Sequence, residues 1–324
     1  MTNKLVHKFN NNTLRLAMSQ PAKKQKASQA SPKAAKAKQA AIKTVKAAEP
    51  ANEAKSDFRG LNGPDPELMN GQAPLWNRLM DHYFRLEIDG FDRLPKDPSL
   101  VIGIHSGVSL TMDAWTFVMA WWRHFGEKRK LHGTAHDLLM NAPVVGNYFE
   151  RLGALSPSRE NICKALDQGD DVILWPGGEV DSCRSWKKRD KAILGGRKGF
   201  IRLAIKQGVP ITPVATVGGH DTLFVLSEGR GLAKMLGLKE KLRTEVAPIT
   251  LSYPFGLGVT LTPFQHIPLP AKIRTEVLDP IYVSNDPEMA NDEEYVQAIY
   301  DQVEGAIQAG MDRLAKKRRF PIFG

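Results

Sequence analysis

The sequence predicts an α/β fold, in which a mostly parallel sheet is flanked by helices and preceded by a disordered basic tail. Short apolar runs alternate with longer segments of helical periodicity from about residue 80 to residue 282, which is typical of βαβ units. Polar or glycine-rich loops directly follow two of these runs, as is common at the ends of buried strands. Residues 1–56 contain eleven Lys and one Arg but only two Glu, so the net charge of +10 belongs to this segment alone.

The N-terminal segment differs in composition from the rest of the chain, and we place the boundary near residue 58. Residues 1–58 are rich in Lys and Ala and hold too few apolar side chains for a core, so we expect them to be disordered. Such a tail can bind anionic lipid, bind nucleic acid without specificity, or only solubilise the chain. No aromatic residue interleaves the lysines of residues 19–56, so we expect an anionic membrane surface, and not nucleic acid, as its partner.

Residues 59–324 form the single predicted domain. No apolar run reaches the roughly 18 residues that a membrane-spanning helix requires. Cys163 and Cys183 show no metal-ligand spacing and indicate a reducing compartment. We therefore expect a cytoplasmic protein that is peripheral on the cytoplasmic face of a membrane, where residues 223–242 provide a further contact. The amphipathic segment 68–82 either packs on the domain or lies on the bilayer as well.

The expected strands are short and mostly apolar. Residues 83–88 alternate between apolar and polar side chains, whereas residues 100–105 form a continuous apolar run that stops at His105. Pro210 and Pro213 suggest that the strand after them lies at an edge or enters the sheet there. The expected strands are 83–88, 100–105, 131–135, 153–155, 171–175, 211–217 and 272–281.

Helical signals separate these strands. Residues 112–125 are apolar almost all round and contain three tryptophans, so this helix is either buried or lines an apolar slot. Residues 157–168 follow Ser156 as a helix cap and carry Glu160 in the first turn. The expected helices are 68–82, 112–125, 143–149, 157–168, 196–207 and 292–314.

His105 and Asp113 flank a small-residue loop between the strand at 100–105 and the helix at 112–125. In α/β folds, chemistry gathers where the carboxyl ends of strands meet helix N-termini. A His at this place can act as a base, and an Asp beside it can hold the imidazole in the required tautomer. The structural alternative is a hydrogen-bonded His and an Asp that only interacts with the helix dipole.

A second candidate loop, Trp-Pro-Gly-Gly-Glu at 175–179, also follows a predicted strand. Its two glycines allow backbone N–H groups to approach a ligand, and basic residues at the start of the next helix can bind phosphate. The candidate binding residues here are Gly177, Gly178, Glu179, Arg197 and Lys198. The alternative is a plain turn followed by a solvated charged loop. Arg151 could likewise bind an anionic headgroup or only pair with Glu150 or Asp170.

Two other groups of polar residues have simpler interpretations. His132, His136 and Asp137 have a spacing that suits a metal on a helix, but residues 131–135 are predicted as a strand and no Glu follows as a base. We therefore expect no metal site. Gly219-His220-Asp221 is expected to cap a loop.

Taken in order, these segments resemble the glycerolipid acyltransferase family, which includes the lysophosphatidic acid acyltransferases. That family carries a His and an Asp separated by four residues, then Gly-x-x-Phe-x-x-Arg, then Phe-Pro-Glu-Gly, then Val-Pro-x-x-Pro-Val. The corresponding segments here are His105 with Asp113, Gly146–Arg151, Trp175–Glu179 and Val209–Val214, and residues 195–200 resemble the family's approach to the next helix. Seven residues separate His105 from Asp113, and Gly177 stands at the family's Glu position, which suggests a divergent branch.

The resemblance implies an O-acyltransferase similar to the 1-acylglycerol-3-phosphate O-acyltransferases. Such an enzyme moves a fatty acyl group from an acyl-CoA or acyl-ACP thioester to a hydroxyl of a lysophospholipid or glyceride. The thioester is a co-substrate, so the resemblance implies no metal and no other cofactor. His105 would be the general base and Asp113 would orient it.

The resemblance also assigns the remaining candidates to substrate binding. Arg151, Arg197 and Lys198 would bind a phosphate, the backbone at Gly177 and Gly178 would stabilise the oxyanion, and Glu179 would hold acceptor hydroxyls. A non-catalytic lipid- or membrane-binding protein that keeps the fold is the alternative. A nucleic-acid-binding protein that depends on the tail is a third, weaker one.

Overall fold

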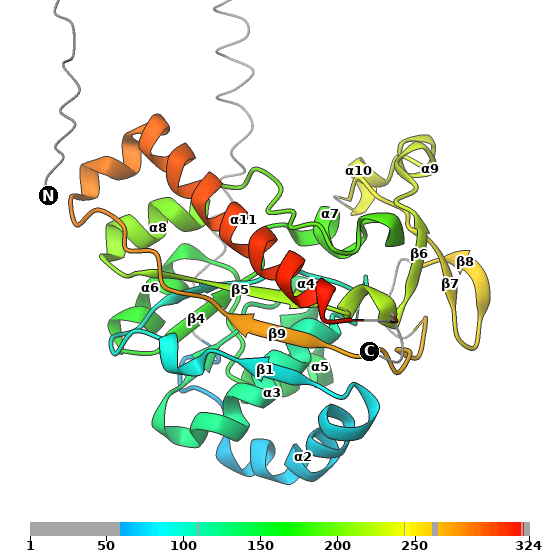
Figure 1. Cartoon of the computed structure of the whole chain (residues 1–324), viewed down its shortest axis with the longest axis horizontal. Coiled ribbons are helices and arrows are strands. Elements are labelled where there is room, and N and C mark those ends of the chain that lie inside the picture. The colour runs from blue at the N-terminus through cyan, green and yellow to red at the C-terminus, as the bar shows by residue number, and fades with distance from the viewer. Residues whose placement is uncertain (1–58, 109, 243, 261–264, 319, 321–324) are drawn as a thin grey trace, which may run out of the picture. The chain divides into compact units, whose positions relative to one another are not determined.

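The computed structural model describes residues 59–320, except for residues 109, 243, 261–264 and 319. The tail predicted at residues 1–58 lies outside the described residues. Among the described residues, no helix is both long enough and apolar enough to span a bilayer. The described chain has the α/β architecture that the sequence predicts (Figure 1).

The main sheet has six strands in the order β1-β9-β5-β2-β4-β3. β5, β2, β4 and β3 run parallel to one another, while β9 pairs antiparallel with β5 and parallel with β1. The sheet is therefore mostly parallel, as predicted. Its strands are β1 (Glu87–Asp89), β2 (Leu100–Ile102), β3 (Leu131–His132), β4 (Asp171–Leu174), β5 (Ile211–Val217) and β9 (Arg274–Val277).

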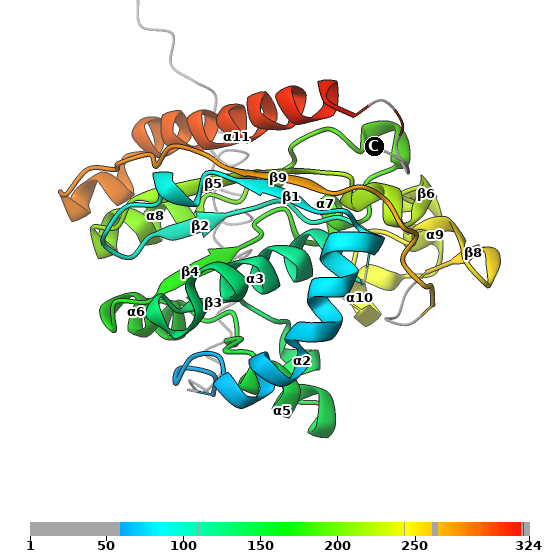
Figure 2. The same cartoon turned by 60° about the horizontal axis from the view of Figure 1, so that its bottom comes forward.

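Six helices lie close to the predicted segments: α2 (Pro66–Arg78), α3 (Met112–Phe125), α5 (Pro143–Arg151), α6 (Arg159–Asp167), α8 (Gly199–Gln207) and α11 (Glu293–Lys316). The short helices α4 (Asp137–Met140) and α7 (Gly178–Ser182) are not among the predicted ones. Figure 2 shows the layers: α11 lies over one face of the sheet, and α3 and then α2 lie over the other. Successive strand residues serve the two faces in turn, because Leu100 and Ile102 pack with α8 and α11 while Val101 packs against α3.

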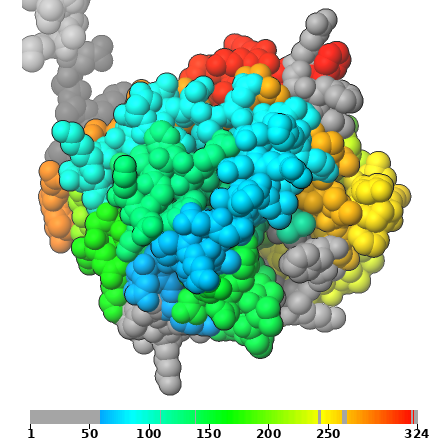
Figure 3. Space-filling model, turned by 90° about the horizontal axis from the view of Figure 1, so that it is seen from below, coloured from blue at the N-terminus to red at the C-terminus, as the bar shows by residue number. Residues whose placement is uncertain are grey.

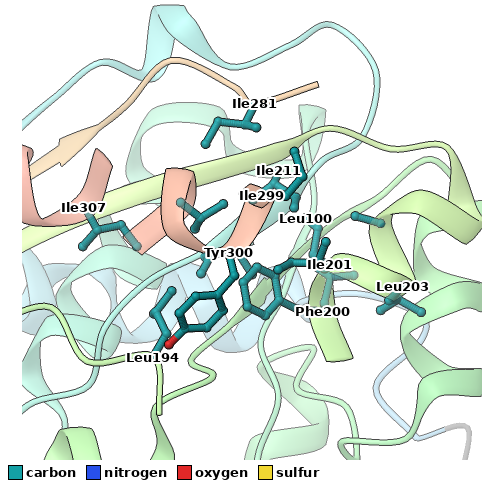
Figure 4. Close-up of a cluster of buried hydrophobic side chains, with 14 of the residues drawn as sticks. Leu100, Leu194, Phe200, Ile201, Leu203, Ile211, Ile281, Ile299, Tyr300 and Ile307 are labelled. Carbon is teal, nitrogen blue, oxygen red and sulfur yellow. The ribbon is translucent and has the colours of Figure 1, made fainter. Parts of the chain in front are cut away.

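The larger core lies between the sheet and the pair α8 and α11 (Figure 4). Tyr300 of α11 packs there near Phe200 of α8 and Leu194. Its hydroxyl accepts a hydrogen bond of 2.9 Å from the Gly196 N–H, so α11 also fixes the segment that leads into α8. Gly310 lets α11 approach the sheet, since a β-carbon there would lie 2.6 Å from the β-carbon of Ala215.

The strand predicted at 83–88 begins only at Glu87. α2 continues into a π-helical turn, η1 (Leu79–Tyr83), which ends with a 2.8 Å hydrogen bond from the Phe84 N–H to the Leu79 carbonyl. This turn uses residues that alternate like a strand, and tertiary packing decides their conformation.

Other boundaries also differ from the prediction. Ser158, and not Ser156, caps α6, because its Oγ accepts a 3.1 Å hydrogen bond from the Asn161 N–H. The strand predicted at 153–155 forms a single bridge to Thr134. β3 and β9 are shorter than predicted, and α8 begins at Gly199.

Candidate active site

Three loops meet at the carboxyl edge of the main sheet. β2 lies between β4 and β5 and is parallel to both, so all three strands end at the same edge. The loop after β2 contains His105, and the turn after β4 contains Trp175. β5 is followed by a buried 3-10 helix, η5 (Gly219–Thr222). The structure thus brings together the two loops that the sequence singles out, and adds a third.

The His105 imidazole stacks on the Trp175 indole. The ring centroids are 4.8 Å apart and the planes differ by 9°. Gly103 leaves space for the indole, since a β-carbon there would lie 2.9 Å from Trp175 Nε1. Stacking fixes the orientation of the imidazole, and an aromatic face also stabilises a ring that gains positive charge.

A buried ion pair holds the backbone of this loop. The Arg184 guanidinium pairs with Asp181 of α7 and donates a 2.8 Å hydrogen bond to the His105 carbonyl. Asp181 in turn accepts a hydrogen bond from the His105 N–H. Both charged side chains are almost completely buried, with 1% and 0% exposure. The peptide groups on both sides of His105 are therefore fixed by α7 and the residues that follow it.

The loop itself is strained. Val108 has a φ of 58°, which a β-branched side chain rarely adopts. Its N–H donates a 3.1 Å hydrogen bond to the Ser182 carbonyl, so contact with α7 maintains this conformation. Strain of this kind costs roughly 1–3 kcal/mol and is concentrated at functional sites.

Six buried polar atoms at this edge have no hydrogen-bond partner among the described residues. They are His105 Nδ1, Ser106 Oγ, both carboxylate oxygens of Asp113 and both ring nitrogens of His220. A β-carbon on Gly219 would lie 1.9 Å from Ser106 Oγ and 3.3 Å from Asp113 Cβ, so η5 packs directly on this loop. We term His105, Ser106, Asp113 and His220 the His105 cluster. The Ser106 hydroxyl lies near enough to act on the Asp113 carboxyl, and the backbone of His105 and Asp181 acts on the His220 ring, but none of these contacts is a well-formed hydrogen bond. Because buried polar groups are nearly always paired, a ligand or a rearrangement can supply better partners here.

Burial also shifts the ionisation of the cluster. It lowers the pKa of His105 to about 3, and the Arg184 charge adds to this effect. Burial raises the pKa of Asp113 to about 7, although the nearby Ser106 hydroxyl opposes the shift. Burial likewise lowers the pKa of His220 well below its usual range. At neutral pH the two imidazoles are therefore neutral, and Asp113 is close to its point of half-ionisation.

No hydrogen bond joins His105 to Asp113 in the described part of the chain. Asp113 and Ser106, the residue after His105, both lie against Gly219, and His105 and Asp113 each have buried polar atoms without a described partner. Asp113 lies in the first turn of α3, as predicted, but it is 3% exposed and has no described cap partner to satisfy it. A simple role at the helix dipole does not account for such deep burial.

The Trp-Pro-Gly-Gly-Glu turn packs tightly beside this cluster. A β-carbon on Gly177 would lie 2.1 Å from the Ile193 carbonyl oxygen, so only glycine fits there. The Gly178 N–H is used within the turn, where it donates a 3.2 Å hydrogen bond to the Trp175 carbonyl. Glu179 pairs with Arg197 at 3.1 Å, and Arg197 also donates a 3.1 Å hydrogen bond to the Pro176 carbonyl. These contacts show that Gly177 and Gly178 both contribute to the structure of the turn.

The two remaining predicted cations have partners elsewhere. Arg151 pairs with Asp65, the N-cap of α2, at 2.7 Å, and not with Glu150 or Asp170. Lys198 lies 3.7 Å from Glu293 of α11. Arg197 is therefore the one of the three predicted cations that contacts the turn beside His105.

The segment expected to cap a loop at residues 219–221 is instead part of the site. Asp221 is buried and pairs with Arg318 at 2.5 Å, and its Oδ1 accepts a 2.8 Å hydrogen bond from Trp186 Nε1. His220 belongs to the His105 cluster. The rule that located His105, a polar residue shortly after a buried strand, would also have found His220. No sequence signal indicates the contacts of Asp181 with the loop after β2, because they join residues 76 positions apart.

His132, His136 and Asp137 do not form a metal site in the structure. The buried His132 ring lies 2.9 Å from the Gly153 carbonyl and 3.1 Å from Asp170, so both nitrogens have partners. His136 and Asp137 are exposed. In the part of the chain that the structure describes, no three metal-ligating side chains come together.

A groove of about 390 Å³ separates α2 from the C-terminal half of α3. Its lining includes Met69, Trp76, Met80, Met119 and Trp122. Figure 3 shows α2, in blue, lying across this face of the molecule. The lining residues of α3 lie six to twelve positions beyond Asp113, which corresponds to roughly 9–18 Å along the helix.

The chain is similar in sequence to a known protein family and to several known proteins. The sequence model of the family described as diacylglycerol acyltransferase matches residues 72–309. An uncharacterized protein of Mycobacterium tuberculosis is 28% identical over 268 residues, which cover 81% of this chain and 71% of that protein. The chloroplastic phytyl ester synthase 1 of Arabidopsis thaliana is 26% identical over 240 residues, which cover 69% of this chain and 33% of that protein.

A solved structure also aligns with this fold. It is the 1-acyl-sn-glycerophosphate acyltransferase of Thermotoga maritima, which superposes with a TM-score of 0.46 at 19% identity. The alignment covers 81% of this chain and 87% of that chain.

Proposed function

The chain belongs to the diacylglycerol acyltransferase family, and we propose that it transfers a fatty acyl group from an acyl-CoA or acyl-ACP thioester to a hydroxyl of a glycerolipid at the His105 cluster. The observation that carries this assignment is the concentration, at the carboxyl edge of the sheet, of six buried polar atoms without a described partner, which belong to His105, Ser106, Asp113 and His220. Acyl transfer from a thioester requires a base and accurate positioning, because the thioester is already activated.

In the proposed reaction, His105 removes the proton of the acceptor hydroxyl as its oxygen attacks the thioester carbonyl. The C–S bond then breaks, and the imidazolium returns the proton to the leaving thiolate. Asp113 and the Trp175 indole stabilise the imidazolium between these steps. Asp181 and Arg184 act as positioning residues, since they hold the peptide groups on both sides of His105.

Two features bear on the substrates. Arg197 lies over the turn beside His105 in an exposed ion pair, which an incoming phosphate can replace at little cost. We assign to it a phosphate of the thioester carrier. Arg151 is engaged with Asp65 and makes no described contact with the His105 cluster. This favours a neutral acceptor such as a diacylglycerol over lysophosphatidic acid, the acceptor that the motif resemblance suggests.

The acyl chain needs apolar contacts, and we assign it to the Met and Trp side chains of the groove between α2 and α3, which Asn70, Asn77, Arg123, His124 and Glu127 also line. Trp122 lines the groove and is partly buried, with its Nε1 3.2 Å from Asn70 Oδ1. Trp122→Arg should shorten the preferred acyl chain, because a charge in the groove is costly to bury. Competition between acyl-CoA substrates of different length measures this preference, and an unchanged preference would remove the groove from the proposal.

Lipid acceptors lie in membranes, so we propose that the protein is peripheral on the cytoplasmic face of an anionic membrane. The basic composition of residues 1–56 supports this, since each Lys near such a surface contributes about 1 kcal/mol.

The experiment that tests the function is thiol release from a long-chain acyl-CoA, with diacylglycerol, with lysophosphatidic acid and without an acceptor. Release that requires diacylglycerol supports the proposal in full. Release that requires lysophosphatidic acid would support the acyltransferase activity but would show that lysophosphatidic acid, and not diacylglycerol, is the acceptor. Binding of these lipids without release would instead support a lipid-binding protein that retains the fold.

A further inference from the structure

A second, smaller sheet leaves the main sheet directly after η5. It consists of β6 (Phe224–Ser227), β7 (Ile249–Ser252) and β8 (Gly256–Val259), all antiparallel. Two short helices, α9 (Arg230–Met235) and α10 (Leu238–Leu242), connect β6 to β7. Figures 1 and 2 both show these elements at one side of the domain, on the right of each view.

The outward face of this sheet is apolar, while its inward face combines Val225 with threonines. Thr250 is buried, and its hydroxyl lies 2.6 Å from that of Thr260. Leu251 and Leu257, which are cross-strand partners, are 49% and 69% exposed, and Val259 is 37% exposed. One-sided antiparallel sheets normally bury apolar side chains and expose polar ones. The outward apolar face therefore requires a partner outside the described chain.

The turn between β7 and β8 extends this apolar surface. Tyr253 and Phe255 in the turn are 63% and 67% exposed. Residues 246–271 contain no Asp, Glu, Lys or Arg, although 25% of the whole chain is charged. Exposed aromatic rings beside aliphatic side chains are typical of surfaces that enter the interfacial layer of a bilayer.

The connection between β6 and β7 carries a small excess of positive charge, and Arg230 and Lys239 in it pair with Glu228 and Glu245. α9 exposes Lys234 next to Met235, which is 74% exposed. Residues 223–245 contain five basic and three acidic side chains. Cations beside an apolar face complement the phosphates of lipid headgroups.

The excursion also begins at the active-site edge. Gly219 of η5 packs on Ser106 and Asp113. Only one residue, Leu223, separates the end of η5 from the start of β6 at Phe224. The Leu269 N–H donates a 2.8 Å hydrogen bond to the Thr222 carbonyl, so the chain that returns from the small sheet is also fixed to η5. A surface that binds here is therefore close to the place where a lipid acceptor must enter.

We propose that the outward face of the β6-β7-β8 sheet, with Tyr253 and Phe255 at its turn, docks on the surface of a lipid bilayer and presents the His105 cluster to acceptors in that bilayer. The consequence for catalysis rests on the proposed function, whereas the docking itself does not. The bilayer is favoured as the occupant because the apolar face, the aromatic turn and the exposed cation occur together, and because the adjoining site belongs to a family that acts on lipids.

The test is flotation of the full chain with vesicles of phosphatidylcholine and phosphatidylglycerol, in high salt so that the basic tail is screened. The double variant Phe255→Ser, Leu257→Ser should lower the fraction bound by roughly tenfold or more, since two large apolar side chains no longer leave water. The matched control is Val144→Ser, Tyr282→Ser, which removes two side chains that are 83% and 70% exposed elsewhere on the protein. The control should float like the wild type, and thermal unfolding checks that both variants are folded.

Two readouts separate the docking surface from the enzyme. With an acceptor embedded in vesicles, thiol release by the Phe255, Leu257 variant should fall with its binding. With a soluble short-chain diacylglycerol, its release should match the wild type. If no protein releases thiol with any acceptor, the proposed function fails, but flotation still decides the docking.

Three results would overturn the docking proposal. The first is a wild type that does not float. The second is equal flotation of the wild type and the Phe255, Leu257 variant, or equal loss in the variant and its control. The third is a wild type that sediments as a dimer without vesicles while the variant sediments as a monomer, because a second copy of the chain would then be the occupant.

Discussion

Two buried groups of His and Asp side chains lie at opposite edges of the main sheet, and they differ in how their polar atoms are satisfied. At the amino edge, Asp171 accepts hydrogen bonds of 2.6 and 2.9 Å from Arg129 and two of 2.9 Å from Ser99. His132 beside it has a partner at each ring nitrogen, the Gly153 carbonyl and Asp170. We term Ser99, Arg129, His132, Asp170 and Asp171 the Asp171 network. At the carboxyl edge, the His105 cluster has six buried polar atoms without a described partner.

The difference indicates what each group contributes. A fully paired network ties β2, β3 and β4 together and leaves no polar atom for a ligand. An unpaired cluster lowers the stability of the fold, because buried polar groups without hydrogen bonds are costly. Such a cost is retained where the same groups meet a substrate or a transition state. The comparison therefore assigns structure to the Asp171 network and chemistry to the His105 cluster.

The largest expected effect is the loss of activity in Asp113→Asn. The amide cannot stabilise the imidazolium of His105, so kcat/KM for acyl transfer should fall by roughly 10²–10⁴-fold. The same variant should be more stable than the wild type above pH 7, by about 1–3 kcal/mol, because the raised pKa of Asp113 means that its ionised form destabilises the fold. Steady-state kinetics and thermal unfolding at pH 8 measure both effects. Wild-type activity in this variant would exclude Asp113 from the mechanism.

Asp171→Asn should have the opposite pattern. It leaves Arg129 without its charged partner and weakens two hydrogen bonds from Ser99, so the free energy of unfolding should fall by about 2–4 kcal/mol. Activity per folded molecule should remain within about twofold of the wild type, since the network lies at the far edge of the sheet. Denaturant unfolding, together with activity below the unfolding transition, tests this. A large loss of activity in a folded Asp171→Asn protein would contradict the assignment of a structural role to the Asp171 network and a catalytic role to the His105 cluster.

The pH dependence of kcat/KM should also distinguish the His105 cluster from the Asp171 network. Burial sets the pKa of Asp113 at about 7 and that of His105 at about 3, so the active state, with ionised Asp113 and neutral His105, is lost as the pH falls below about 7. kcat/KM should therefore decline by about tenfold per pH unit on the acidic side and level off above pH 7. The profile of Asp171→Asn should keep this limb. Burial also raises the pKa of Asp181 to about 7, so any acidic limb that remains in Asp113→Asn belongs to Asp181. A wild-type rate that stays constant from pH 5.5 to pH 8 would contradict the assignment.

The sequence predicts the sheet and most helices because their signals are local. The apolar runs at β2, β4 and β5 and the periodicity of α3, α8 and α11 determine the layers, and the parallel order places the loops after β2 and β4 at one edge. His105, Trp175 and the turn beside them follow from that order.

The remaining features depend on tertiary contacts that no local pattern records. His105 ends an apolar run and His132 lies in a predicted strand, and only the structure shows that both ring nitrogens of His132 have partners while His105 Nδ1 has none among the described residues. Arg151 meets Asp65, a partner 86 positions away, instead of its neighbours. η1 and the Ser158 cap depend on packing and on local hydrogen-bond geometry, which shift boundaries by a few residues.

The most direct test of the central claim is acceptor-dependent thiol release by wild type, His105→Ala and His132→Asn, each normalised to folded protein. The account predicts that His105→Ala loses at least about 10²-fold in rate and remains folded. It predicts that His132→Asn loses stability but keeps the wild-type rate per folded molecule, because its two hydrogen bonds are structural. Persistent release by folded His105→Ala would show that His105 is not the base, and loss of release in folded His132→Asn would show that pairing does not separate the two sites.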